Sequence, residues 1–108
     1  GAMVTDRYLT IVHHPTVEDF GNYCRENGLP IIGIDNLPGI SKQLESTQLP
    51  ESCVLLFGQE GAGMSKEGVA VCEVVLEINQ YGSTRSMNAS AAGAIAMYHW
   101  ALQHLPRN

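Results

Sequence analysis

The chain has 108 residues, enough for one domain with a single hydrophobic core but not for two. Hydrophobic residues make up 44% of it and charged residues 16%, the composition of an ordinary soluble globular protein. The formal net charge of −5 argues against a strongly basic surface that would bind nucleic acid by itself.

Targeting segments and metal sites are not indicated by the sequence. Residues 1–3 look like the remnant of a cleaved tag, so the domain is taken as residues 4–108. No apolar run approaches the ~18 residues of a membrane span, and no signal peptide is visible, so we expect a cytoplasmic protein. The cysteines, Cys24, Cys53 and Cys72, lack CxxC spacing and are interpreted as free thiols packed like small hydrophobic residues, with no metal bound.

The first half of the chain predicts alternating strands and helices. Tyr8–His13 is β-rich, and a helix capped by Thr16 follows and ends at Gly28. Leu29–Asp35 is continuously apolar, as buried parallel strands are. Ser41–Ser46 is predicted to form a short helix.

The second half repeats this alternation. The predicted elements are a strand over Cys53–Phe57, a helix from Ser65 to about Val71, a strand over Glu73–Ile78 and a helix from Ser86 or Asn88 to about His104. Strands alternating with helices are typical of an α/β fold, here with a mostly parallel sheet and helices on both faces.

The last predicted helix is rich in small residues, including Gly93, although glycine inside a helix costs roughly 1 kcal/mol relative to alanine. The helix is therefore either pressed against a loop or a second chain, or an ordinary alanine-rich buried helix. Four residues that follow at helical spacing are interpreted as core or dimer contacts: Met97, Trp100, Ala101 and His104.

Two loops that follow predicted strands contain the candidate functional residues. The first, Gly58–Gly63, is glycine-rich; the second, Ile78–Asn88, is polar. Because the carboxyl ends of parallel strands share one edge of the sheet, both loops are expected on that rim, at the tips of two neighbouring strands, as a backbone-lined cup for a small cofactor. The glycine spacing fits neither a Walker A loop nor the dinucleotide fingerprint. A simple tight turn and helix capping by Ser86 and Asn88 are the alternatives.

Together the loops resemble the second and third motifs of the SpoU-type RNA 2′-O-methyltransferases of the SPOUT superfamily. The first motif-like stretch is Phe57-Gly58-Gln59-Glu60-Gly61-x-Gly63-Met64. The second is Ile78-Asn79-Gln80-x-Gly82-x-x-x-Ser86-Met87-Asn88-Ala89-Ser90-x-Ala92. The family pattern at the second is Ile-Pro-x-x-Gly-x-x-x-Ser-Leu-Asn-Val-Ser/Ala-x-Ala, and the separation of the two motifs also agrees.

The resemblance implies a fold with a C-terminal trefoil knot, a homodimer, and S-adenosylmethionine-dependent methylation of ribose 2′-hydroxyls in tRNA or rRNA. It assigns cofactor binding to Gly58, Ile78 and Met87, with Phe57 and Gly63 beside them. It assigns polar catalytic positions to Glu60, Ser86 and Asn88, and Arg85 is a candidate RNA contact. The acidic excess lies mainly before Gly58, so the second half is expected to face RNA, with positive charge supplied by another segment or subunit.

The chain also departs from the family pattern. Asn79 replaces a proline, Met87 replaces a leucine, and nothing before Cys53 matches the first family motif, Asn-x-Gly-x-x-x-Arg. We therefore expect the C-terminal part of a longer enzyme, able to bind the cofactor weakly but unable to methylate RNA alone. The alternatives are a non-catalytic knotted module for dimerisation or RNA docking, with a vestigial pocket, and an unrelated α/β nucleotide binder.

Overall fold

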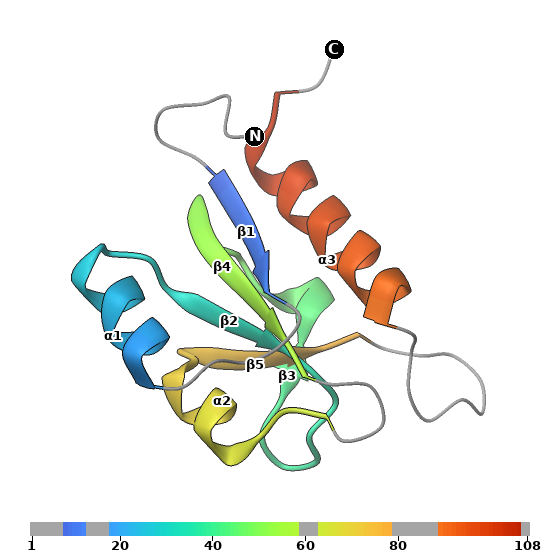
Figure 1. Ribbon diagram of the computed structural model, residues 1–108. Helices are drawn as coiled ribbons and strands as arrows, with labels where there is room; N and C mark the ends of the chain where they lie inside the picture. The colour runs from blue at the N-terminus through green and yellow to red at the C-terminus, as the bar shows by residue number, and fades with distance from the viewer. Residues whose placement is uncertain (1–7, 13–17, 59–62, 79–88, 107–108) are drawn as a thin grey trace.

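The computed structural model describes residues 8–12, 18–58, 63–78 and 89–106 (Figure 1). Five strands form a parallel sheet in the order β1-β4-β2-β5-β3. The strands are β1 (Tyr8–Val12), β2 (Ile31–Ile34), β3 (Lys42–Gln43), β4 (Ser52–Phe57) and β5 (Val74–Glu77). The helices are α1 (Glu18–Glu26), a 3₁₀ turn η1 (Leu44–Ser46), α2 (Lys66–Val71) and α3 (Ala89–His104).

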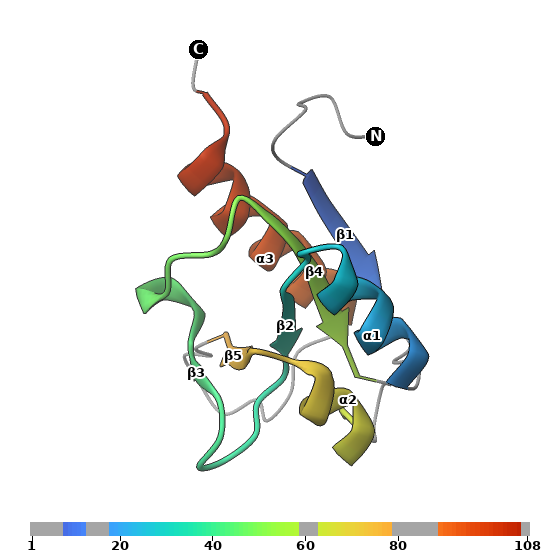
Figure 2. The same cartoon turned by 90° about the vertical axis from the view of Figure 1, so that its left-hand side faces the viewer.

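Side chains of the central strands are buried on both faces of the sheet. From β4, Cys53, Leu55 and Phe57 pack in the cluster that contains Ala96 and Trp100 of α3. The alternate β4 residues, Val54 and Leu56, pack with residues of α1 and α2 in a second cluster. Figure 2 shows α3 on one side of the sheet and α1 and α2 on the other. The predicted α/β class, with a parallel sheet covered on both faces, is confirmed.

The predicted end of the first helix and the predicted start of the second are also confirmed. Gly28 follows α1 with φ at +66°, the left-handed conformation that ends helices. Ser65 caps α2, because its Oγ accepts a hydrogen bond of 3.0 Å from the amide of Gly68. Thr16, the predicted cap of α1, lies outside the described residues. Among the described helices, none is both long and apolar enough to cross a membrane.

The helix predicted over Ser41–Ser46 is wrong. Lys42–Gln43 forms the edge strand β3, which pairs with Leu76 and Glu77 of β5, and only Leu44–Ser46 makes a 3₁₀ turn. A strand of two exposed residues has no hydrophobic alternation by which the sequence could reveal it. The predicted strand over Leu29–Asp35 also shortens to Ile31–Ile34.

Two small residues of α3 lie against the sheet. Gly93 and Ala96 are buried, and a Cβ atom on Gly93 would lie 3.9 Å from Cζ of Phe57 in β4. Small side chains therefore let α3 pack closely over the central strand. The predicted trefoil knot depends on the connection over residues 79–88, which lies outside the described residues, so it stays a prediction.

Candidate functional site

The rim formed by the carboxyl ends of the strands contains the described part of both motif-bearing loops. Gly58 directly follows β4 and Ile78 directly follows β5, and both strands run parallel in one sheet. They are not neighbours, however. Strand β2 lies between them, with Ile34 paired to Phe57 on one side and to Leu76 on the other. The interpretation of the two loops as following adjacent strands is therefore wrong, and the end of β2 forms the middle of the rim.

The main chain folds back on itself in the loop after β4. A Cβ atom on Gly58 would lie 2.3 Å from the carbonyl carbon of Gly63 and 2.4 Å from the amide nitrogen of Met64. Gly63 itself has φ at +76°, which L side chains rarely adopt. Both glycines are half-buried. The close approach requires glycine at Gly58, and it brings the main chain of Gly63 and Met64 to the rim beside that residue.

Asp35 links this loop to the neighbouring strands. Its Oδ2 accepts a hydrogen bond of 2.9 Å from the amide of Met64, and its Oδ1 accepts one of 2.8 Å from the amide of Asn36. Its own amide donates to the carbonyl oxygen of Leu76 at 3.0 Å. Sequence reasoning missed Asp35, although a carboxylate directly after a buried apolar strand was an available signal.

The other predicted cofactor residues contribute differently. Phe57 is only 2% exposed, so its ring belongs to the core and only its main chain can meet a ligand. Ile78 is half-buried and packs against the same core cluster. The remaining predicted site residues lie outside the described residues, and their roles stay predictions: Glu60, Arg85, Ser86, Met87 and Asn88.

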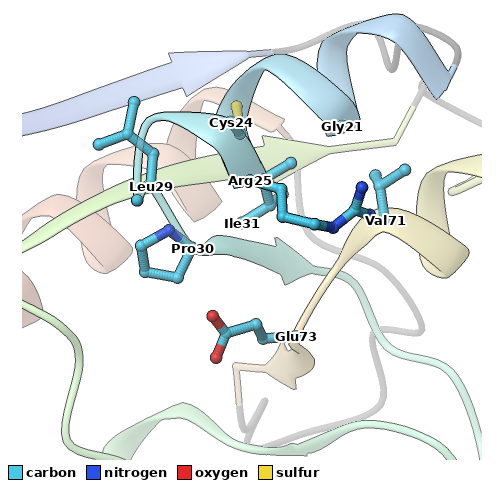
Figure 3. Close-up of a pocket in the computed structure, with 9 residues that line it drawn as sticks. Gly21, Cys24, Arg25, Leu29, Pro30, Ile31, Val71 and Glu73 are labelled. Carbon is cyan, nitrogen blue, oxygen red and sulfur yellow. The ribbon is translucent and has the colours of Figure 1, made fainter.

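A pocket of about 250 Å³ lies elsewhere, at the opposite edge of the sheet (Figure 3). Its walls come from α1, the segment before β2 and the connection between α2 and β5, and include Arg25, Pro30 and Glu73. Pro30 precedes β2 and Glu73 precedes β5, so this pocket opens at the amino ends of the strands. It is therefore separate from the rim that carries Gly58 and Ile78.

The cysteines are free, as predicted. Burial raises the pKa of the Cys53 thiol to about 12 and that of Cys72 to about 11. Both are therefore neutral thiols near pH 7, a form that is a poor nucleophile and a poor metal ligand. Within the described part of the chain, no group of three or more His, Cys, Asp or Glu side chains could hold a metal ion.

The sequence matches the SpoU rRNA Methylase family over residues 1–98. It is 29% identical over 109 residues to the 23S rRNA (guanosine-2'-O-)-methyltransferase RlmB of Neisseria meningitidis, an alignment that covers 100% of this chain and 41% of that protein. It is 25% identical over 107 residues to the tRNA (guanosine(18)-2'-O)-methyltransferase of Saccharomyces cerevisiae, covering 96% of this chain and 7% of that protein.

Solved structures agree in fold. The SpoU methyltransferase AviRb from Streptomyces viridochromogenes, in complex with the cofactor AdoMet, is 27% identical with a TM-score of 0.64, over 80% of this chain and 32% of that one. An AdoMet-bound rRNA methyltransferase from Sinorhizobium meliloti, 24% identical over 82% of this chain and 34% of that one, has a TM-score of 0.72 and supports the fold alone. The chain spans less than half the length of these relatives. Since the family match covers nearly all of it, the chain belongs to the SpoU rRNA methylase family.

Proposed function

We propose that this chain is the cofactor-binding part of an S-adenosylmethionine-dependent RNA ribose 2′-O-methyltransferase that acts on tRNA or rRNA. The observation that carries the proposal is the rim at the carboxyl ends of the strands, where Gly58 lies directly against the main chain of Gly63 and Met64. Family membership and the AdoMet-bound relative support the choice of cofactor. The relatives from Neisseria meningitidis and Saccharomyces cerevisiae are both named as guanosine methyltransferases, which favours a guanosine target.

The proposed chemistry asks little of the protein beyond positioning. S-adenosylmethionine supplies an activated methyl group, and a ribose 2′-hydroxyl, present only in RNA, attacks it in line. Main-chain groups of Gly58 and Ile78 would bind and orient the cofactor. Among the polar residues, Glu60 would organise the loops, while Ser86 and Asn88 would hydrogen-bond the cofactor or the ribose. Met87 would add main-chain contacts, and Arg85 would contact an RNA phosphate.

A homodimer through α3 is part of the proposal. The sequence of α3 contains no Asp, Glu, Lys or Arg, the residues that helices usually turn toward water. One side nevertheless faces outward, at residues spaced three or four apart: Ile95, Tyr98, Leu102 and Leu105, each 39% to 65% exposed. A second copy of this chain would cover that stripe, which matches the dimer expected from the family resemblance.

Calorimetric titration tests the cofactor proposal. We expect S-adenosylmethionine and its demethylated product to bind the wild-type chain with micromolar Kd, and Gly58→Val to abolish binding, because its side chain would collide with the main chain at Gly63. Gly93→Ala is the matched control, since a Cβ there meets only ordinary contacts. Circular dichroism establishes that each variant is folded.

Three results would contradict this reading. A folded wild-type chain that binds neither compound favours the non-catalytic module. A preference for a nucleoside phosphate favours the unrelated nucleotide binder. Robust methyl transfer to RNA by the isolated chain would show that the first family motif is dispensable.

Sedimentation analysis tests the dimer. We expect Tyr98→Lys to shift the chain to monomer, because it places a charge in the apolar stripe, where the tyrosine is 65% exposed. Tyr23→Lys is the matched control, since Tyr23 is similarly exposed but lies on α1. A wild-type chain that stays monomeric at high micromolar concentration would exclude this interface.

A further inference from the structure

We infer that Asp35 is a positioning residue for cofactor binding, because its carboxylate holds the loop after β4 in the arrangement that receives the cofactor. The inference rests on the proposed function and adds a residue that lies outside both motif-like loops. It starts from the strand order, which puts the end of β2 between β4 and β5.

The register places Asp35 in the centre of the rim. Phe57, Ile34 and Leu76 form one row across β4, β2 and β5. One residue further along the parallel strands, Asp35 lies between Gly58, which follows β4, and Glu77, the last residue of β5. Its amide donates to Leu76 of β5, so its main chain is fixed against one motif-bearing strand while its side chain reaches toward the loop that follows the other.

Both oxygens of the carboxylate are used. Oδ2 accepts from the amide of Met64 at 2.9 Å, across 29 residues of sequence, and Oδ1 accepts from the amide of Asn36 at 2.8 Å. Hydrogen bonds from N–H groups to a carboxylate are stronger than those between neutral groups. An asparagine at this position has one acceptor oxygen and a donor amide, so it could keep only one of the two bonds.

The segment that Asp35 binds through the Met64 amide also contacts Gly58. A Cβ atom on Gly63 would lie 3.0 Å from Oδ2 of Asp35, and the same short segment lies directly against Gly58. The Met64 side chain is buried over β2, where a Cβ atom on Gly33 would lie 3.0 Å from its sulfur. The carboxylate and this packing therefore fix the end of the loop from two sides. Gly58 is the proposed cofactor contact that they support.

A merely structural tie would behave differently. The neighbouring hydrogen bond of 2.6 Å between Ser41 Oγ and Glu77 Oε1 also joins two segments near this rim. Losing a structural tie lowers the free energy of unfolding and leaves the affinity of the folded protein unchanged. Losing a positioning tie lowers the affinity of the folded fraction as well, because the loop must then be ordered by the ligand.

The experiment compares Asp35→Asn, Asp35→Ala and Asp35→Glu with wild type. Asp19→Asn, an exposed aspartate on α1, is the matched control. The Kd for S-adenosylmethionine is measured by calorimetry at a temperature where every variant is folded, and hydrogen exchange follows the Met64 amide. We expect Asp35→Asn to weaken binding about tenfold and Asp35→Ala at least as much, with faster exchange at Met64. Asp35→Glu, which keeps both acceptor oxygens, should recover part of the affinity, and Asp19→Asn should match wild type.

The outcomes separate the two claims. Wild-type Kd in folded Asp35→Asn and Asp35→Ala overturns the positioning role and leaves the proposed function standing. A wild-type chain that binds no S-adenosylmethionine overturns the proposed function, and the positioning role falls with it. Asp35→Asn is nearly isosteric and keeps one hydrogen bond, so it provides a folded variant if the alanine variant unfolds.

Discussion

The rim at Gly58 and the contact between α3 and residues 47–51 hold irregular main chain in opposite ways. At the rim, the main chain of Gly58 lies against that of Gly63 and Met64, and the carboxylate of Asp35 accepts a hydrogen bond from the Met64 amide. At the second region, here called the α3 join, side chains of α3 bind the main chain of the facing segment. Trp100 Nε1 lies 3.1 Å from the carbonyl oxygen of Pro50 and 3.2 Å from that of Glu51.

Gln103 adds two hydrogen bonds to the α3 join, one as an acceptor and one as a donor. Its Oε1 accepts from the amide of Leu49 at 2.8 Å, and its Nε2 donates to the carbonyl oxygen of Thr47 at 2.9 Å. At the join, protein side chains satisfy the main-chain groups of an irregular segment, so few remain for a ligand. At the rim, Gly58 instead lies directly against the main chain of Gly63 and Met64. We propose that the join stabilises the fold and that the rim binds the ligand, and each prediction below tests that separation.

Trp100→Ala should have the largest effect on stability. Trp100 is 7% exposed in the core between α3 and the sheet, and truncating a large buried aromatic residue typically costs 3–5 kcal/mol. Urea unfolding measures this loss. Trp100→Phe, which keeps much of the packing but loses the N–H donor, should cost about 1–2 kcal/mol. A folded Trp100→Ala that retains wild-type stability but binds S-adenosylmethionine poorly would break the separation of join and rim.

Gln103→Ala should have an intermediate effect. It removes both main-chain hydrogen bonds of this side chain and leaves the amide of the buried Leu49 without that partner, at a cost of about 1–3 kcal/mol. Gln48→Ala is the matched control, because Gln48 is exposed and its truncation should change stability by less than about 0.5 kcal/mol. Neither variant should alter the Kd for S-adenosylmethionine, measured on the folded protein. A weaker Kd in Gln103→Ala alone would link the two regions.

Much of the fold could be predicted from the sequence because its strands and helices carry strong local signals. The apolar run that forms β4 and the capping serine of α2 both act within a few residues. The two-residue strand β3 could not be predicted, since its pairing with β5 exists only in three dimensions. The order of strands was also hidden, and with it the place of β2 between the two loops.

The candidate site, too, could be predicted only where local signals or strand direction indicated it. Gly58 and Ile78 could be placed on one rim because parallel strands end together. The role of Asp35 depends on a hydrogen bond to a residue 29 positions away, which no local pattern encodes. The partners of Trp100 were equally hidden, although a place in the core was one of the two roles predicted for it, the other being a dimer contact. The roles of Glu60, Ser86 and Asn88 rest on the family resemblance rather than on any physical pattern in the chain.

The smallest expected effect is a pH dependence that compares the join with the rim. Cys53 begins the buried part of β4 near the join, and burial raises its pKa from 9.0 to about 12. Above pH 9 the unfolded chain therefore releases a proton that the folded chain keeps, so stability is full below pH 9 and is lost as pH rises toward 12. Between pH 8 and 9.5, the free energy of unfolding of wild type should fall about 0.8 kcal/mol further than that of Cys53→Ala.

Urea unfolding at several pH values measures this difference, and Cys72→Ala is the matched variant on the other face of the sheet. Cys72 lies in the connection that precedes β5, its sulfur and that of Met64 both pack over Gly33, and burial raises its pKa to about 11. Its contribution should therefore stop changing at a lower pH than that of Cys53. Equal pH dependence in wild type and Cys53→Ala would mean that water reaches β4 beside the join. The join would then admit solvent, and the proposed separation of the two regions would be lost.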